Sequence, residues 1–221
     1  MTVAERFALS GDPHRLGLLR EAYAEAPGHG AGGPASKRII AGYGFWIFLL
    51  SDFVLFSCFF ASYMVLRGAS AGGPTESQLF DLNTVAAETA CLLVSSLFSG
   101  MASLAAGARN RLWFQLMMAA TAALGAGFIG LELNEFVRLI GEGAGPQRSA
   151  FLSAFFSLVG CHGLHVSLGL LWSVMMMAQV LTQGFRADVL RRVLCFTLFW
   201  HALDIVWVGI FTVVYLPGVT P

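Results

Sequence analysis

The sequence predicts an all-α integral membrane protein with five transmembrane helices. Only 12% of its 221 residues are charged and 57% are hydrophobic, whereas soluble domains carry roughly 25% charged residues. The stretch from Phe151 to Leu181 has 31 residues and no formal charge. A transmembrane helix needs only about 20 mostly apolar residues. This stretch therefore crosses a bilayer with length to spare.

Five apolar runs follow one another along the chain, with short polar gaps between them. They lie at about 43–66, 83–105, 115–140, 151–182 and 193–217. Each run is long enough to cross the hydrocarbon core. We therefore divide the chain into an N-terminal segment, 1–42, and a five-helix domain, 43–218. The N-terminal segment has no early apolar core, so we expect no signal peptide.

The distribution of basic residues predicts the orientation. With the N-terminus inside, the inner segments 1–42, 106–114 and 183–192 carry five, two and three Lys or Arg residues. The outer segments carry only Arg67, Arg138 and Arg148. Because cytoplasmic loops are enriched in Lys and Arg, the N-terminus is expected to be cytoplasmic and the C-terminus periplasmic.

Several classes of function lack their sequence signals. The four cysteines are single and no C-x-x-C occurs, which argues against covalently attached haem, iron–sulfur clusters and zinc ribbons. No H-E-x-x-H or Walker motif is present, so neither a zinc metalloprotease nor a nucleotide site is indicated. A formal net charge of zero gives no reason to expect a nucleic-acid partner.

Eight ionisable side chains fall inside the predicted spans, where an unpaired charge is costly. They are Asp52, Glu88, Glu132, Glu135, His162, His165, His201 and Asp204. From their depths we predict a polar seam between the last two helices, in which His165 meets His201 or Asp204. We predict a second cluster, Glu88 with Glu135, toward the outer side.

Two functional uses of these residues compete with simple hydrogen bonding between helices. Imidazoles on facing helices hold membrane haems, and His165 and His201 lie at matching depths, but bulky neighbours leave no evident cleared pocket. A proton path needs acids from one side to the other, and the inner third of every span lacks one. We therefore favour structural roles, with no catalytic, cofactor-binding or metal-binding residue. Stripes such as Ser95, Ser99 and Ser103 are interpreted as close-packing faces alone.

Four stretches resemble subunit III of the haem–copper respiratory oxidases. They are GFWIFLLSDFVLF at 44–56, GAGFIGLELNEF at 125–136, the run from Gly145 to Trp172, and LFWHALDIVWVGIFTVVYLPG at 198–218, which contains W-H-x-x-D-x-V-W. The likeness covers roughly 37–218. Five spans in place of seven, Asp52 where longer relatives carry Glu, and G-P-x-R-S at 145–149 are similar to the cytochrome o (bo-type) ubiquinol oxidase branch.

The resemblance implies an accessory role in aerobic electron transport. In this family the haems and copper belong to subunit I, and subunit III carries no cofactor and has no activity alone. It packs beside subunit I, in a complex that also holds subunits II and IV, in the bacterial cytoplasmic (inner) membrane. It binds phospholipid in a V-shaped cleft between helices 1–2 and 3–5, and it supports stability and sustained turnover of a proton-pumping enzyme.

The resemblance also places individual residues. Asp52 corresponds to a buried carboxylate that reacts with carbodiimide in the longer relatives. Buried polar positions of the family correspond to Glu135, His162, His165, His201 and Asp204. We assign structural or lipid-cleft roles to these residues, and also to Glu88 and Trp200.

Two alternatives remain open. One is subunit III of a cytochrome c oxidase, because the choice of electron donor is made by other subunits. The other is an independent proton-coupled transporter with Asp52 as its coupling site. Transporters of that kind show internal repeats and broken helices, and neither is evident in this sequence.

Overall fold

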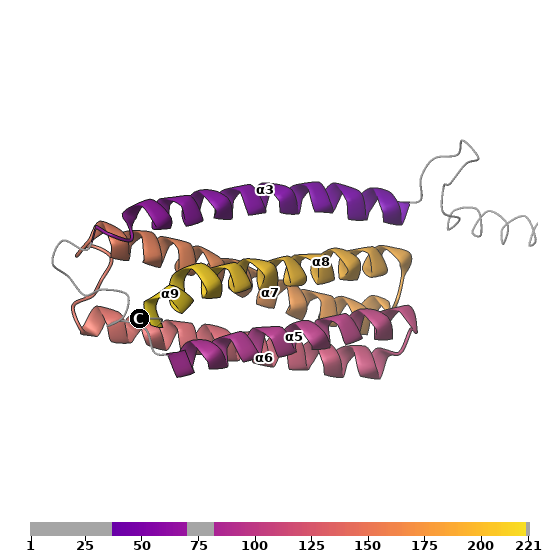
Figure 1. Ribbon diagram of the computed structural model, residues 1–221. Coiled ribbons are helices and arrows are strands. Elements are labelled where there is room, and N and C mark those ends of the chain that lie inside the picture. The colour runs from indigo at the N-terminus through magenta and orange to yellow at the C-terminus, as the bar shows by residue number, and fades with distance from the viewer. Residues whose placement is uncertain (1–36, 70–81, 220–221) are drawn as a thin grey trace, which may run out of the picture. The chain divides into compact units, whose positions relative to one another are not determined.

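The structure, a computed structural model, describes residues 37–69 and 82–219. All regular structure in these residues is helical (Figure 1). Among the described residues, five helices are long and apolar enough to cross a membrane, which confirms the predicted five spans. They are α3 (Lys37–Leu66), α5 (Leu82–Gly107), α6 (Arg111–Gly141), α7 (Ala150–Gln183) and α8 (Ala187–Ile210). Most of the predicted N-terminal segment, residues 1–36, lies outside the described residues.

The helices begin earlier than the apolar runs because hydropathy marks only the part inside the hydrocarbon core. Helix α6 begins at Arg111, where the side chain of Asn110 accepts a hydrogen bond from the Trp113 amide. Ser149 caps α7 in the same way, by accepting from the Leu152 amide. Such caps satisfy amides that have no partner within the helix.

The last helix changes its winding near its end. Helix α8 passes without a break into a π-helical turn, η1 (Phe211–Tyr215), and then into the short α9 (Leu216–Val219). A π-helical turn shifts the residues after it around the helix axis. This shift affects which face of the helix carries Tyr215.

Helices α5, α6, α7 and α8 form a four-helix bundle within the compact unit Phe45–Pro221. Each packs against the next along the chain, and α8 closes the ring by packing against α5. The short turns alternate between the two ends of the bundle, so neighbouring helices are antiparallel (Figure 1). This is the up-and-down arrangement that short connections favour.

From Phe45 onward, α3 meets the bundle through large aromatic side chains. The ring of Phe45 lies 5.8 Å from that of Trp172, and the ring of Tyr63 lies 5.9 Å from that of Phe151. Both partners belong to α7. Such long side chains keep the α3 backbone farther from its neighbours than the four bundle helices are from each other.

This arrangement corrects the predicted grouping of helices 1–2 against helices 3–5. The second span, α5, packs against α6 and α8, so it belongs with the last three spans and does not pair with α3. Ser95 and Ala102 on α5 are fully buried. Because small side chains let helices approach closely, α5 enters the bundle and α3 does not.

The centre of the bundle is built around the indole of Trp200. A Cβ atom at Gly125 of α6 would lie 2.9 Å from this ring, and one at Gly169 of α7 would lie 2.8 Å from it. Any larger residue at either position would collide with the indole. The two glycines therefore make the space into which α8 inserts its largest side chain.

Candidate functional site

Three carboxyl groups meet inside the bundle. Glu88 on α5 is 0% exposed, and Glu132 and Glu135 on α6 are each 3% exposed. The three lie close enough to interact electrostatically. The structure thus brings Glu88 and Glu135 together and adds Glu132. We call these three residues the carboxyl cluster.

The members of the cluster have different surroundings. Neither carboxyl oxygen of Glu88 has a hydrogen-bond partner among the described residues, and neither does Oε2 of Glu132. The Glu132 carboxyl packs on the α7 backbone, where a Cβ at Gly163 would lie 2.7 Å from Oε1. Glu135 lies 3.8 Å from the guanidinium of Arg138. Only Glu135 therefore has a cation beside it in the described part of the chain.

Tyrosine side chains complete this part of the core. Tyr215, which is 1% exposed, comes from the π-helical turn and interacts electrostatically with all three carboxyl groups and with Tyr63. Tyr63 comes from α3, and Gly163 comes from α7. Residues from all five spans therefore gather around the carboxyl cluster. A π-helical turn at such a place is typical of positions under functional or packing constraint.

His162 lies in a dry, aromatic environment. It is 0% exposed, and neither ring nitrogen has a hydrogen-bond partner among the described residues. Its ring centroid lies 5.2 Å from that of Trp207, 5.7 Å from that of Phe128 and 6.3 Å from that of Phe56. His162 therefore acts as a core aromatic ring that joins α3, α6, α7 and α8.

The polar face of α8 is directed at α5. Nδ1 of His201 is hydrogen-bonded to the hydroxyl of Ser96 at 2.5 Å, and Asp204 also hydrogen-bonds Ser96. The indole of Trp200 donates to the hydroxyl of Ser95 at 3.0 Å. The indole of Trp207 likewise donates to the hydroxyl of Thr89 on α5 at 3.0 Å. We call this set of hydrogen bonds the α5–α8 seam.

The prediction of a polar seam between the last two helices is therefore wrong, because His201 and Asp204 of α8 contact Ser96 of α5. His165 makes no hydrogen bond to His201 or Asp204 within the described residues. Its Nδ1 donates instead to the carbonyl oxygen of Cys161, one turn earlier on α7, at 2.7 Å. Its ring lies 5.2 Å from that of Phe56 on α3. Depth in the membrane identifies the polar residues of each helix, but the rotation of the helix about its axis decides which partners they contact.

Asp52 on α3 lies close enough to Cys161 on α7 to interact with it electrostatically. It lines a shallow groove between α3 and α8. The other lining residues are apolar and are Leu49, Phe53, Phe56, Phe199, Ala202, Leu203 and Val206. Asp52 is thus the single polar residue in the lining of this groove.

The described residues contain no group of three or more His, Cys, Asp or Glu side chains placed to hold a metal ion. His165 and His201, the two imidazoles considered for haem binding, use their Nδ1 atoms for Cys161 and Ser96. The arrangement is therefore one of interhelical and intrahelical hydrogen bonds.

Sequence reasoning missed the partners of the α5–α8 seam. Ser95 was interpreted as part of a packing stripe alone, whereas its hydroxyl accepts the Trp200 hydrogen bond. Ser96 and Thr89 carried no signal beyond being small polar residues in an apolar run. Tyr215 was missed because the π-helical turn alters the periodicity on which face assignments depend.

Comparison with known proteins gives consistent matches. The family model described as cytochrome c oxidase subunit III matches residues 18–219. The cytochrome bo(3) ubiquinol oxidase subunit 3 of Pseudomonas aeruginosa is 54% identical over 180 residues, which are 80% of this chain and 84% of that protein. The quinol oxidase subunit 3 of Bacillus subtilis is 42% identical over 175 residues, covering 79% and 86% of the two chains.

A relative with a different name also matches over a long stretch. The cytochrome c oxidase subunit 3 of Bacillus sp. (strain PS3) is 40% identical over 201 residues, which are 91% of this chain and 96% of that protein. The match to the family model, residues 18–219, includes all five membrane-spanning helices and the residues of the carboxyl cluster. The chain belongs to the cytochrome c oxidase subunit III family.

Proposed function

We propose that this chain is subunit III of a bo(3)-type ubiquinol oxidase, a haem–copper enzyme of aerobic respiration. The observation that carries the proposal is the 54% identity to the Pseudomonas aeruginosa protein of that name over most of both chains. A second Pseudomonas relative with the same name is 49% identical over 176 residues. The haems and copper then belong to subunit I, and this chain acts as a cofactor-free accessory.

The contacts within the bundle support a scaffolding role. The indoles of Trp200 and Trp207 both donate hydrogen bonds from α8 to α5. His162 is enclosed by aromatic rings and has no polar partner among the described residues. These side chains fix the relative rotation of the helices. A rigid surface of this kind can support subunit I and keep it stable during turnover, in association with subunits II and IV.

The basic residues support the orientation. The turns at 108–110 and 184–186 lie at one end of the bundle, next to Arg109, Arg111 and Arg186. In this proposal that end faces the cytoplasm, because short cytoplasmic loops are enriched in Arg and Lys. The C-terminus is then periplasmic and the protein resides in the bacterial cytoplasmic membrane.

The groove between α3 and α8 is the proposed place for a phospholipid tail. Its lining is apolar except for Asp52, which suits an acyl chain running along the helices. An Ala202→Phe substitution would fill the groove, and fewer phospholipids should then remain with the purified protein. Ile205→Phe, on an exposed face of the same helix, is the matched control and should leave the lipid content unchanged. Equal lipid loss in both variants would contradict this placement.

Purification of the tagged chain from its membranes tests the main proposal. The chain should migrate with a large assembly that shows a haem absorption spectrum and oxidises ubiquinol with reduction of oxygen. Recovery of the chain alone, without haem and without other subunits, would overturn the proposal.

The electron donor separates the two oxidase alternatives. The Bacillus PS3 relative is named a cytochrome c oxidase subunit, so the purified assembly should be assayed with both donors. Our proposal expects oxygen consumption with ubiquinol and none with reduced cytochrome c. The opposite pattern would assign the chain to a cytochrome c oxidase.

A further inference from the structure

We propose that the end of the bundle formed by the α5–α6 and α7–α8 turns binds the headgroup of an anionic phospholipid. The binding groups are the guanidinium groups of Arg109, Arg111 and Arg186. We call this region the arginine end. It is separate from the groove between α3 and α8, and it depends on the chain spanning a membrane rather than on the identity of its complex.

The arginine end carries a large excess of positive charge. Its basic residues are Arg109, Arg111, Arg186, Arg191 and Arg192. The acid among them, Asp188, is already paired with Arg191. Arg192 donates to the side chain of Gln179 at 2.8 Å. Within residues 37–69 and 82–219, no ion pair is formed by Arg109, Arg111 or Arg186, so their charges remain to be balanced from outside the described structure.

The two turns are held beside each other, so their arginines act together. The side chain of Gln115 on α6 donates to the backbone oxygen of Met177 on α7 at 3.0 Å. The guanidinium of Arg111 extends across to the end of α7, where a Cβ at Gly184 would lie 2.5 Å from Nη2. Gly184 also has a φ of +68°, a conformation that suits glycine. A glycine here therefore leaves the space that Arg111 occupies.

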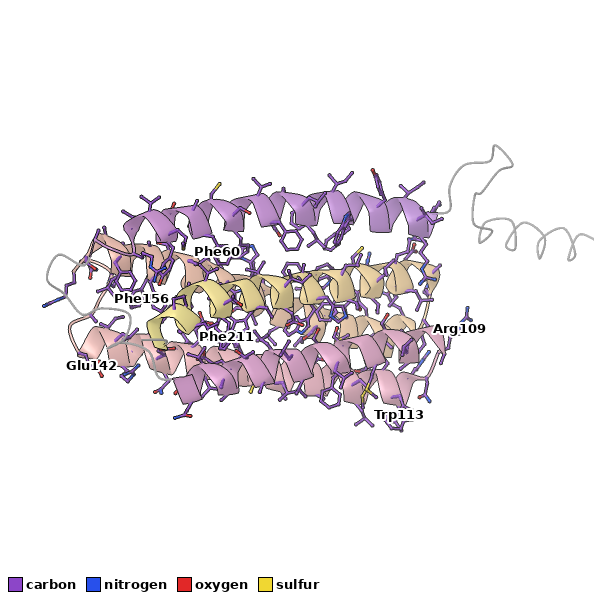
Figure 2. The ribbon with its side chains drawn as sticks, viewed as in Figure 1. Phe60, Arg109, Trp113, Glu142, Phe156 and Phe211 are labelled. Carbon is purple, nitrogen blue, oxygen red and sulfur yellow. The ribbon has the colours of Figure 1, made fainter. Side chains whose placement is uncertain are left out.

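Arg109 extends from the neighbouring turn. Its φ of +54° is in the left-handed region, which non-glycine residues seldom adopt. The residue is exposed, and Figure 2 shows its side chain pointing away from the end of the bundle. Arg186 is exposed on the other turn. Within the described residues, three guanidinium groups without acidic partners thus lie at one end of the bundle.

Apolar side chains directly below the arginines distinguish a lipid from a soluble anion. Trp113 and Leu112 are exposed on the first turn of α6, and Leu181 is exposed on the last turns of α7. Figure 2 shows Trp113 at the same end as Arg109. Tryptophan is enriched where the bilayer meets water. A ligand that contacts both the arginines and these apolar side chains has an anionic headgroup and acyl chains.

The chemistry of arginine favours a phosphate-bearing headgroup. A planar guanidinium forms paired hydrogen bonds with phosphate oxygens. Each Arg or Lys near an anionic membrane surface contributes about fivefold to binding, and this contribution decreases as salt screens the charges. Three guanidinium groups that have no ion pair in the described part of the chain are therefore enough to distinguish anionic from zwitterionic phospholipids.

The test uses the chain purified from membranes in the assembly in which it occurs. After delipidation in detergent, the protein is titrated with phosphatidylglycerol or phosphatidylcholine, and bound lipids are counted by native mass spectrometry. We expect phosphatidylglycerol to bind more tightly, with an affinity that decreases as salt is raised. Arg111→Gln should weaken its binding by roughly fivefold, and Arg111→Lys should retain most of it. Inorganic phosphate should not displace the lipid.

Arg148→Gln provides the matched control, because Arg148 is exposed at the other end of the bundle. This variant should bind phosphatidylglycerol as the unaltered protein does. Should Arg111→Gln fail to assemble, Arg109→Gln on the exposed turn replaces it, with the same expected weakening. Unchanged phosphatidylglycerol affinity in the arginine-end variants, equal binding of the two lipids, or equal weakening by Arg148→Gln would overturn the proposal.

Discussion

The indole of Trp200 donates a hydrogen bond to the hydroxyl of Ser95, 3.0 Å away and 105 positions earlier in the chain. Both side chains are buried, so the bond lies where neither group has access to water. It joins the last span to the second and closes the ring of four helices. The predictions below test this contact and the packing around it.

Ser95→Ala should destabilise the bundle by about 1 kcal/mol, because the indole N–H of Trp200 is left buried without a partner. The free energy of unfolding in a detergent titration is the measurement. Ser99→Ala is the control, since the Ser99 hydroxyl is buried and has no hydrogen-bond partner among the described residues. Equal losses in the two variants would show that the hydrogen bond is not the cause.

Gly169→Ala should cost roughly 1–3 kcal/mol, because its Cβ would lie 2.8 Å from the Trp200 ring and the core would be overpacked. Gly127→Ala is the matched control on α6, where an added Cβ meets nothing within 4 Å. This change should be neutral or slightly stabilising, because alanine favours the helix. A thermal unfolding series of both variants checks the prediction. Similar midpoints for the two proteins would contradict it.

Glu88→Gln should leave stability nearly unchanged, because the amide has nearly the shape and volume of the carboxyl group that it replaces. Glu88→Ala should instead cost about 2–4 kcal/mol, because it opens a cavity in a fully buried site. Measurements of the free energy of unfolding on both variants separate the effect of side-chain shape from the effect of the acidic group. If Gln were as damaging as Ala, the carboxyl group itself would be required.

His162→Phe should be tolerated, with a change within about 1.5 kcal/mol, because the ring is enclosed by aromatic side chains and its nitrogens have no partner among the described residues. The haem content of the purified assembly should also stay the same. His201→Phe is the contrasting variant. It breaks the bond to Ser96 and should destabilise by about 1–3 kcal/mol. Loss of haem in His162→Phe would contradict a structural role for this residue.

The number and approximate positions of the spans could be predicted because they depend on properties summed along the chain. A run such as 151–182 is apolar enough to remain in lipid whatever it packs against, and the structure places α7 at Ala150–Gln183. The buried acids could be identified in the same way, since an ionisable side chain at membrane depth is conspicuous in an apolar run. Glu88 and Glu135 were paired correctly because both enter from the same side at similar depth.

The partners of the α8 side chains could not be predicted, because depth does not fix the rotation of a helix about its axis. His165 and His201 lie at similar depths, yet His165 bonds its own helix and His201 bonds Ser96 on α5. That rotation is set by close packing, in which Gly125 and Gly169 admit the Trp200 ring.

The sequence by itself determined five membrane-spanning helices, a set of buried polar residues and a resemblance to one family, because hydropathy and motifs are local. Only the tertiary structure decided that α5 joins the last three spans, that Ser95 and Ser96 receive the polar face of α8, and that Tyr215 turns toward the carboxyl cluster. These outcomes depend on contacts between residues far apart in the chain. These contacts form together when the helices pack, so they cannot be read from one segment of the sequence at a time.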